Sequence, residues 1–276
     1  MTITQTPPRE ISVPSAAATP ARRGSGLRHA RVLARRSLIK TFRTPEALVD
    51  VTLQPVIFLG LFTYIFGGAI AGAAHRHQYL EFLLPGLLGQ TIAMASVALG
   101  QNLNADIQKG VFDRFRSLPI ARSAPLVGAV LADVARYLIL FTVMMGFGLA
   151  IGFRATNGVL PTLAALLLSV GFAVCFGWIS VFIGMMVRTP GAVQGIMFLV
   201  VLPLSFGSNT FVSVTTLPGW LQVFVKANPI SHLVSTVRAL MLGGPVQTDL
   251  LWTLGWMAGI LAVFFPLALR GYRRHA

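Results

Sequence analysis

Residues 160–187 read LPTLAALLLSVGFAVCFGWISVFIGMMV and contain no Asp, Glu, Lys or Arg. An α-helix needs roughly 20 mainly apolar residues to cross the hydrocarbon core of a bilayer, because each residue adds about 1.5 Å to a path of about 30 Å. A helix also pairs its own backbone N–H and C=O groups, which hydrocarbon cannot do. The run is longer than a strand and lacks the alternation of a lipid-facing barrel. This stretch therefore predicts a transmembrane helix.

Five further stretches are long and apolar enough for the same interpretation: 47–68, 80–103, 126–153, 192–211 and 250–269. The composition of the whole chain supports this interpretation, because 55% of its residues are hydrophobic and only 11% are charged. A soluble domain carries about 25% charged residues. We therefore expect an all-α integral membrane protein with six transmembrane helices.

The basic residues predict the orientation, because Lys and Arg of short loops stay on the cytoplasmic side. Both termini are basic and an even number of spans puts them on one side. With both termini inside, the cytoplasm receives the cluster between Arg9 and Arg43 together with Lys109, Arg114, Arg116, Arg122, Arg136, Arg188, Arg270, Arg273 and Arg274. Only Arg76, Arg154, Lys226 and Arg238 remain outside. The net charge of +14 therefore favours anionic lipids and cytoplasmic partners, and no nucleic acid is expected.

The chain ends lie outside the predicted transmembrane domain, which covers 47–270. Residues 1–26 are rich in Pro, Ser, Thr and Ala and predict a disordered cytoplasmic tail. Residues 27–46 can form a helix with one apolar and one basic face, which is typical of a helix lying among lipid headgroups. A solvated basic tail is the alternative. Residues 271–276 are expected to be a basic cytoplasmic tail.

The loop after the second span reads DIQKGVFDRFRSLPI over residues 106–120. Apolar residues recur at helical spacing from Leu103 to Leu118, and the charged residues on the other side can pair at i,i+3 or i,i+4. Pro119 is expected to end this helix at about Leu118. A short charged helix of this kind suits docking into a groove on a cytoplasmic partner. A simple solvated loop helix explains the same pattern.

Together with a second segment, this loop resembles a known family. The second segment contains Pro218-Gly219-Trp220, then Asn228-Pro229-Ile230-Ser231-His232, and then Arg238. The two motifs and their separation resemble the type-2 ABC exporter permeases, particularly the daunorubicin-resistance-like drug permeases. The resemblance covers roughly Arg28 to Arg274.

The resemblance implies a role for each motif. The loop would be a coupling helix on the ATP-hydrolysing subunit, with Asp106, Lys109, Gly110, Asp113, Arg114, Arg116, Leu118 and Pro119 as its residues. The second segment would form short re-entrant helices on the outer side, with Pro218, Trp220, Asn228, Pro229 and Arg238 as its residues. Asn228 is suited to cap such a helix with Pro229 in the first turn. Arg238 is interpreted as a side chain that snorkels to the interface rather than one that contacts substrate.

Catalytic and cofactor-binding motifs are missing from the sequence. No G-x-x-x-x-G-K-[ST] motif occurs in it, so ATP and Mg are expected on a separate cytoplasmic ABC ATPase subunit. His75 and His77 lack the further ligands of a metal site. Cys175 is the sole cysteine and is expected to be a small buried residue. We expect a permease subunit without catalytic residues.

The expected function is export of an amphipathic drug or antibiotic by a homodimer in a bacterial cell membrane. The substrate class and the homodimer both follow from the resemblance. Export of a lipid or glycan precursor is the alternative, and the residues that would bind substrate are unknown. A proton-coupled transporter is a rival of another class, with Asp133 as its candidate residue, although Asp133 can pair with Arg136 one turn on. A channel and a non-transporting scaffold are further rivals. Small residues four apart occur at Gly68 and Gly72, Gly148 and Gly152, Gly191 and Gly195, and Gly255 and Gly259. They are expected to pack within the chain rather than to form a dimer seam.

Overall fold

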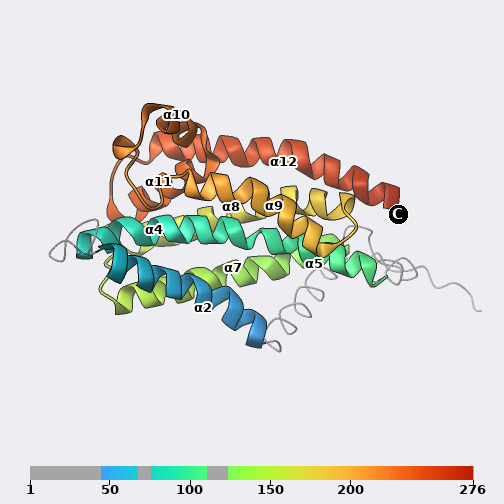
Figure 1. The fold of residues 1–276 in the computed structure, drawn as a ribbon, viewed down its shortest axis with the longest axis horizontal. Helices are drawn as coiled ribbons and strands as arrows, with labels where there is room; N and C mark the ends of the chain where they lie inside the picture. Colours follow the sequence, from blue (N-terminus) through green and yellow to red (C-terminus); the bar gives the residue numbers. More distant parts are fainter. Residues whose placement is uncertain (1–44, 68–75, 111–123, 276) are drawn as a thin grey trace, which may run out of the picture.

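A computed structural model describes residues 45–67, 76–110 and 124–275, and every regular element in these ranges is helical (Figure 1). The elements in chain order are α2 (Pro45–Leu61), η1 (Phe62–Phe66), α4 (Arg76–Ala95), α5 (Val97–Gln108), α7 (Ala124–Ala150), α8 (Val159–Met186), α9 (Pro190–Phe206), η3 (Val214–Thr216), α10 (Gly219–Ala227), α11 (Pro229–Leu242) and α12 (Gln247–His275). The all-α prediction is confirmed for the described residues.

Membrane-spanning length is reached by four stretches of the described chain: His77–Gln108, Asp133–Ala150, Val159–Met186 and Gln247–Gly271. Two shorter apolar helices, Leu53–Ile65 and Pro190–Phe206, accompany them. The chain is thus a multi-pass membrane protein. The count of six spans remains a prediction, since two of the six apolar helices fall short of the needed length within the described ranges.

The second predicted span is not one continuous helix. Its hydrogen-bond ladder is interrupted at Ser96, which separates α4 from α5, and the Ser96 hydroxyl donates to the Ala93 carbonyl at 2.6 Å. Serine in a helix competes for backbone carbonyls in this way, which a hydropathy pattern does not show. The fifth apolar helix also ends earlier than expected, at Phe206, where the Gly207 amide bonds the Pro203 carbonyl and the chain turns.

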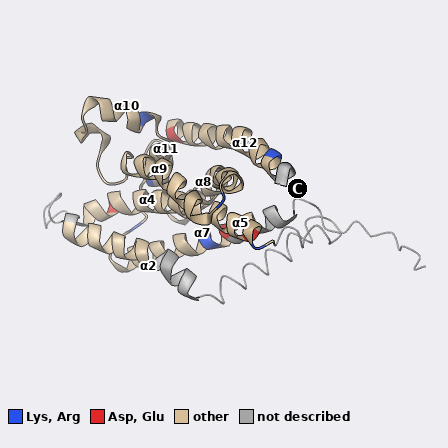
Figure 2. Ribbon diagram, turned by 45° about the vertical axis from the view of Figure 1, so that its right-hand side comes forward, with Lys and Arg blue, Asp and Glu red and all other residues tan. Residues whose placement is uncertain are grey.

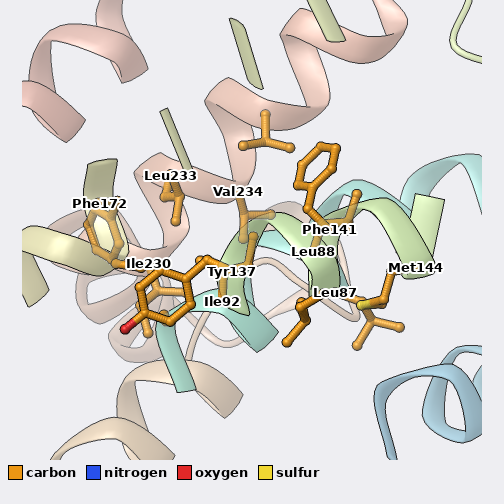
Figure 3. Close-up of a cluster of buried hydrophobic side chains, with 14 of the residues drawn as sticks. Leu87, Leu88, Ile92, Tyr137, Phe141, Met144, Phe172, Ile230, Leu233 and Val234 are labelled. Carbon is orange, nitrogen blue, oxygen red and sulfur yellow. The ribbon is translucent and has the colours of Figure 1, made fainter. Parts of the chain in front are cut away.

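The core lies where α4, α7, α8 and α11 meet (Figure 3). Tyr137 of α7, Phe172 of α8 and Val234 of α11 are completely buried there. α11 therefore contributes to the centre of the bundle, and the expected re-entrant position of this segment on the outer side stays a prediction. By contrast, large apolar side chains such as Leu199 and Leu251 are at least 70% exposed. An apolar exterior is expected of helices surrounded by lipid tails.

Most of the charged residues lie toward the two ends of the bundle, and the helices between them are largely uncharged (Figure 2). We call one the α5 end; it comprises the end of α5, the α8–α9 turn and the last part of α12, and it exposes Lys109, Arg188 and Arg270. The other is the α10 end, which exposes Arg154 and Lys226. The two ends lie at opposite extremes of the long axis (Figure 1). α12 continues as a helix to His275, through most of the predicted C-terminal tail.

Candidate functional site

The predicted coupling segment starts inside α5, which continues from the span to Gln108. Lys109 caps the helix, with its amide bonded to the Ala105 carbonyl at 3.1 Å, and Gly110 follows with φ of 64°. Glycine adopts this left-handed conformation without steric cost and commonly ends helices. The expectation of one continuous helix from residue 106 to 118 is therefore wrong at residues 109–110, where the chain turns.

The structure places part of this segment. Asp106 is half-buried in the last turn of α5, and Lys109 is exposed beyond it. The remaining predicted coupling residues, Asp113, Arg114, Arg116, Leu118 and Pro119, lie outside the described residues, as does the predicted basic helix before residue 45. Their docking role stays a prediction.

A set of hydrogen bonds that the sequence analysis did not anticipate joins the end of α5 to the end of α8. The Asn104 side chain is 3% exposed, and its Nδ2 donates to the carbonyls of Gly184 at 2.8 Å and Val187 at 2.7 Å. Gln108 Nε2 donates to Asn104 Oδ1 at 3.2 Å and to the Arg188 carbonyl. We call Asn104, Gln108 and these three carbonyls the polar clamp.

One turn before the polar clamp, α5 and α8 touch through their backbones. The Gly100 amide donates to Ser180 Oγ at 3.0 Å, and that hydroxyl donates to the Val97 carbonyl at 2.7 Å. A Cβ on Gly100 would lie 2.1 Å from the Ser180 carbonyl oxygen, and one on Gly184 would lie 2.6 Å from that of Gly100. Only glycine fits such an approach. Small residues at this spacing let membrane helices pack closely.

Of the glycine pairs singled out in the sequence, Gly148 packs within the chain. A Cβ there would meet Leu84 Cδ2 at 2.6 Å. Nothing in the described chain lies within 4 Å of the Cβ positions of Gly191, Gly195, Gly255 and Gly259. Intramolecular packing is thus confirmed for Gly148 but does not explain these four. Cys175 is buried and free, as expected.

The expected ion pair between Asp133 and Arg136 is confirmed, with 3.0 Å between Oδ1 and Nη2. The same Nη2 donates to the Ala95 carbonyl at 2.8 Å, next to the break between α4 and α5. Asp133 is 6% exposed. A carboxylate at this depth needs such a partner, and the pair links α7 to the end of α4.

At the α10 end, Asn228 caps α11 as expected, with Pro229 in the first position. Asn228 Oδ1 accepts from the Ile230 amide at 2.9 Å, and Nδ2 donates to the carbonyls of Leu204 and Gly207 at 2.6 and 2.9 Å. The residue therefore starts α11 and also binds the end of α9. Pro218 precedes α10, and Trp220 in its first turn is 76% exposed.

Arg238 does not snorkel outward as the sequence analysis expected. Its guanidinium carbon lies 3.8 Å from the centre of the Phe82 ring. Nε donates to the Phe82 carbonyl at 3.1 Å, and Nη2 donates to the Asn209 carbonyl at 3.0 Å. Carbonyls released by the turn after α9 are available nearby, and a buried guanidinium needs such acceptors. Arg238 thus ties α11 to α4 and to that turn.

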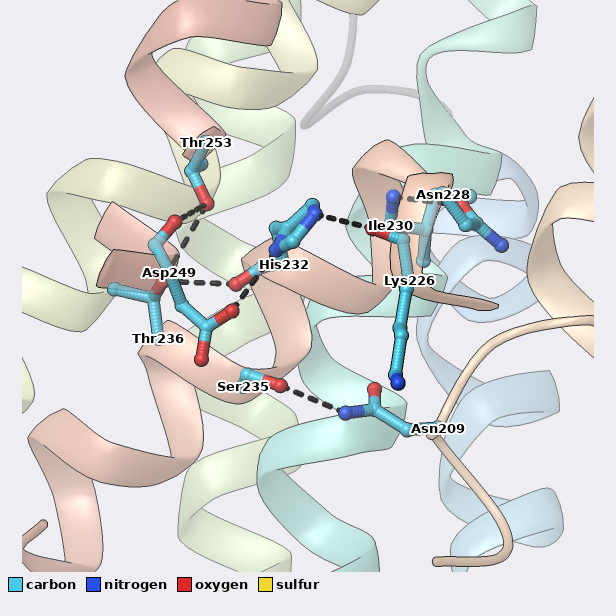
Figure 4. A network of polar contacts seen from close by, with 9 residues as sticks. All are labelled: Asn209, Lys226, Asn228, Ile230, His232, Ser235, Thr236, Asp249 and Thr253. Carbon is cyan, nitrogen blue, oxygen red and sulfur yellow. Dashed lines mark hydrogen bonds and ion pairs between the residues drawn. The ribbon is translucent and has the colours of Figure 1, made fainter. Parts of the chain in front are cut away.

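A second polar group at this end was not anticipated (Figure 4). His232 Nδ1 lies 2.9 Å from Asp249 Oδ1, and Nε2 lies 2.9 Å from the Lys226 carbonyl oxygen. The His232 ring also stacks on Trp252. These contacts join the end of α10 to α11 and to the start of α12.

The fold and these two segments define a multi-pass membrane protein with charged, polar ends and a largely uncharged helical body. The sequence profile of the ABC-2 type transporter family matches residues 28–242, and the chain belongs to this family. It is thus the membrane subunit of an ABC transporter, and membership implies a partner ATPase subunit and dimeric assembly.

Individual relatives cover most of the chain. It is 44% identical, over 83% of its length and 80% of the relative's, to the daunorubicin resistance ABC transporter permease protein DrrB1 of Streptomyces coeruleorubidus. It is 27% identical to the probable doxorubicin resistance ABC transporter permease protein DrrC of Mycobacterium tuberculosis, over 87% of this chain and 86% of the relative. Inner membrane transport permease YadH of Escherichia coli is 26% identical over 79% of this chain and 85% of the relative.

Proposed function

We propose that this chain is the transmembrane subunit of an ABC exporter that moves an amphipathic drug or antibiotic, such as an anthracycline, out of a bacterial cell. The observation that carries the proposal is the 44% identity to a daunorubicin resistance permease over 83% of this chain. The family match over residues 28–242 supports the transporter part of the proposal.

The α5 end is the proposed cytoplasmic side. It exposes Lys109, Arg188 and Arg270 in the described residues, and Arg114, Arg116 and Arg122 follow α5 in the sequence. Basic loops are retained in the cytoplasm. The α10 end then faces outward with Trp220, and aromatic side chains of this kind favour the membrane–water interface.

The proposed mechanism uses two copies of the chain and two ATPase subunits, which dock on residues 106–119. ATP and Mg bind to the ATPase subunits, and their closure moves the docking segment. A rigid-body change of this kind shifts the dimer between inward-facing and outward-facing states. The role of this chain is to form the pathway and to convert that movement into alternating access.

Inside-out vesicles that contain the chain and its ATPase, with daunorubicin as the probe, test the proposal. Uptake that requires ATP, and fails with a non-hydrolysable ATP analogue, is the expected result. Uptake that follows an imposed proton gradient without ATP would replace the proposal with proton-coupled transport. ATP-dependent uptake of a lipid-linked glycan and not of daunorubicin would overturn the drug assignment alone.

A further inference from the structure

We infer that Asn104 is a positioning residue that makes the end of α5 and the α8–α9 turn move as one unit. Displacement of the segment that follows α5 then reaches α8 directly. The inference rests on the proposed function, since it describes how movement of the docked ATPase enters the membrane domain.

The chemistry of the α8 terminus explains why a side chain is needed there. The last carbonyls of any α-helix have no donor within that helix. At this end of α8, the Gly184 carbonyl and the carbonyl of Val187, the residue that follows the helix, both accept hydrogen bonds from the Asn104 amide of α5. A buried carbonyl without a donor costs free energy comparable to a lost hydrogen bond. Separating α5 from α8 therefore leaves both of these carbonyls without their hydrogen-bond donor.

The connection extends along one face of α5. Gly100, Asn104 and Gln108 are spaced four residues apart, so they lie above one another on the helix. Each makes a hydrogen bond to α8 or to the turn after it: Gly100 to Ser180, Asn104 to Gly184 and Val187, and Gln108 to Arg188. Three successive levels of contact resist both sliding and rotation of α5 against α8.

The unit formed by α5 and the α8–α9 turn ends at the start of α5, next to Ser96. The helical ladder is interrupted at Ser96, and Arg136 of α7 binds the Ala95 carbonyl on the α4 side of that break. α4 packs mainly on α11, whereas α5 packs mainly on α8 and α9. The two halves of this span therefore have different main neighbours, although α4 also contacts α8. A push on the end of α5 is transferred to α8 and α9 rather than along α4.

Loss of the Asn104 contacts should have a different effect from loss of ordinary packing contacts, because the effect should be confined to the α5 end. Purely structural contacts would affect the whole bundle when removed. The polar clamp is local to the α5 end, so its loss should separate the responses of two segments while the remaining fold stays intact. Residues 103–110 and 184–190 are the two segments to compare.

The test uses the full complex of this chain with its ATPase in detergent, and measures amide hydrogen exchange with and without a non-hydrolysable ATP analogue. In the wild-type complex, we expect the nucleotide to change exchange in both segments. In Asn104→Ala, the change at 103–110 should persist and the change at 184–190 should be lost. Asn102→Ala is the matched control, because Asn102 is exposed on the same helix; it should behave as wild type.

A wild-type response at 184–190 in the assembled Asn104→Ala complex would overturn the inference and leave the proposed function intact. If Asn104→Ala does not assemble, Asn104→Leu replaces it, because leucine is of similar size but has no group that can donate to the Gly184 and Val187 carbonyls. A reduced response at 184–190 supports the inference, and an unchanged response overturns it. Absence of any ATPase from the wild-type complex would overturn the proposed function and the inference with it.

Discussion

Gly184→Ala tests the close packing of α5 against α8. The added Cβ would lie 2.6 Å from the Gly100 carbonyl oxygen, which is backbone and cannot rotate away. Alanine gains up to about 1 kcal/mol over glycine in a helix interior, but overpacking costs about 1–3 kcal/mol. We expect a net loss of about 1–2 kcal/mol. For a domain of this size, this corresponds to a drop in Tm of roughly 2–8 °C.

Thermal unfolding of the purified chain in detergent, followed by tryptophan fluorescence, measures this change. Gly146→Ala is the control, because Gly146 is also helical and nothing in the described chain lies within 4 Å of its Cβ position. The control should keep or raise the wild-type Tm. Equal Tm values for the two variants would refute the contact between α5 and α8, and with it the reason for a glycine at position 184.

Four further predictions concern other parts of the molecule. Asn228→Ala should lower stability by about 0.5–2 kcal/mol through loss of the α11 cap, measured as a lower Tm; an unchanged Tm would remove the capping role. Arg238→Lys should reduce daunorubicin uptake, because an ammonium group cannot reproduce the planar contact with Phe82 and both carbonyl bonds; full uptake at equal protein abundance would contradict this. Joint replacement of Asp113 and Arg116 by Ala should leave the chain in the membrane but release the ATPase in a pull-down, and retained ATP-dependent uptake would exclude the docking role. Asp133→Asn should preserve the requirement for ATP and create no dependence on a proton gradient, whereas loss of a proton-driven component in vesicles would identify Asp133 as a proton carrier.

The sequence predicts those features that depend on long apolar runs or on neighbouring residues. The helical class follows from the apolar stretches, the cap at Asn228 from the Asn-Pro pair, and the Asp133–Arg136 pair from one turn of helix. Each of these needs only local information. The end of α5 just before Gly110 could also have been anticipated from the glycine itself.

Features that depend on distant backbone groups could not be predicted in the same way. Asn104 and Arg238 bind main-chain carbonyls that lie far away in the sequence, and carbonyls carry no sequence signal. A stripe of small and polar residues was nevertheless visible: Ser96, Gly100, Asn104 and Gln108 recur every four residues. Polar residues on one face of a membrane helix indicate a neighbouring helix on that face. The identity of that neighbour, α8, required the structure.

The central claim is that this chain works as a permease with a separate ATPase, and co-purification from the native host membrane tests it most directly. The account predicts that an ATP-hydrolysing subunit is recovered with the chain in equal copy number, and that two copies of each are present. Recovery of the chain without any ATP-hydrolysing partner, under conditions that keep it folded and dimeric, would contradict the account.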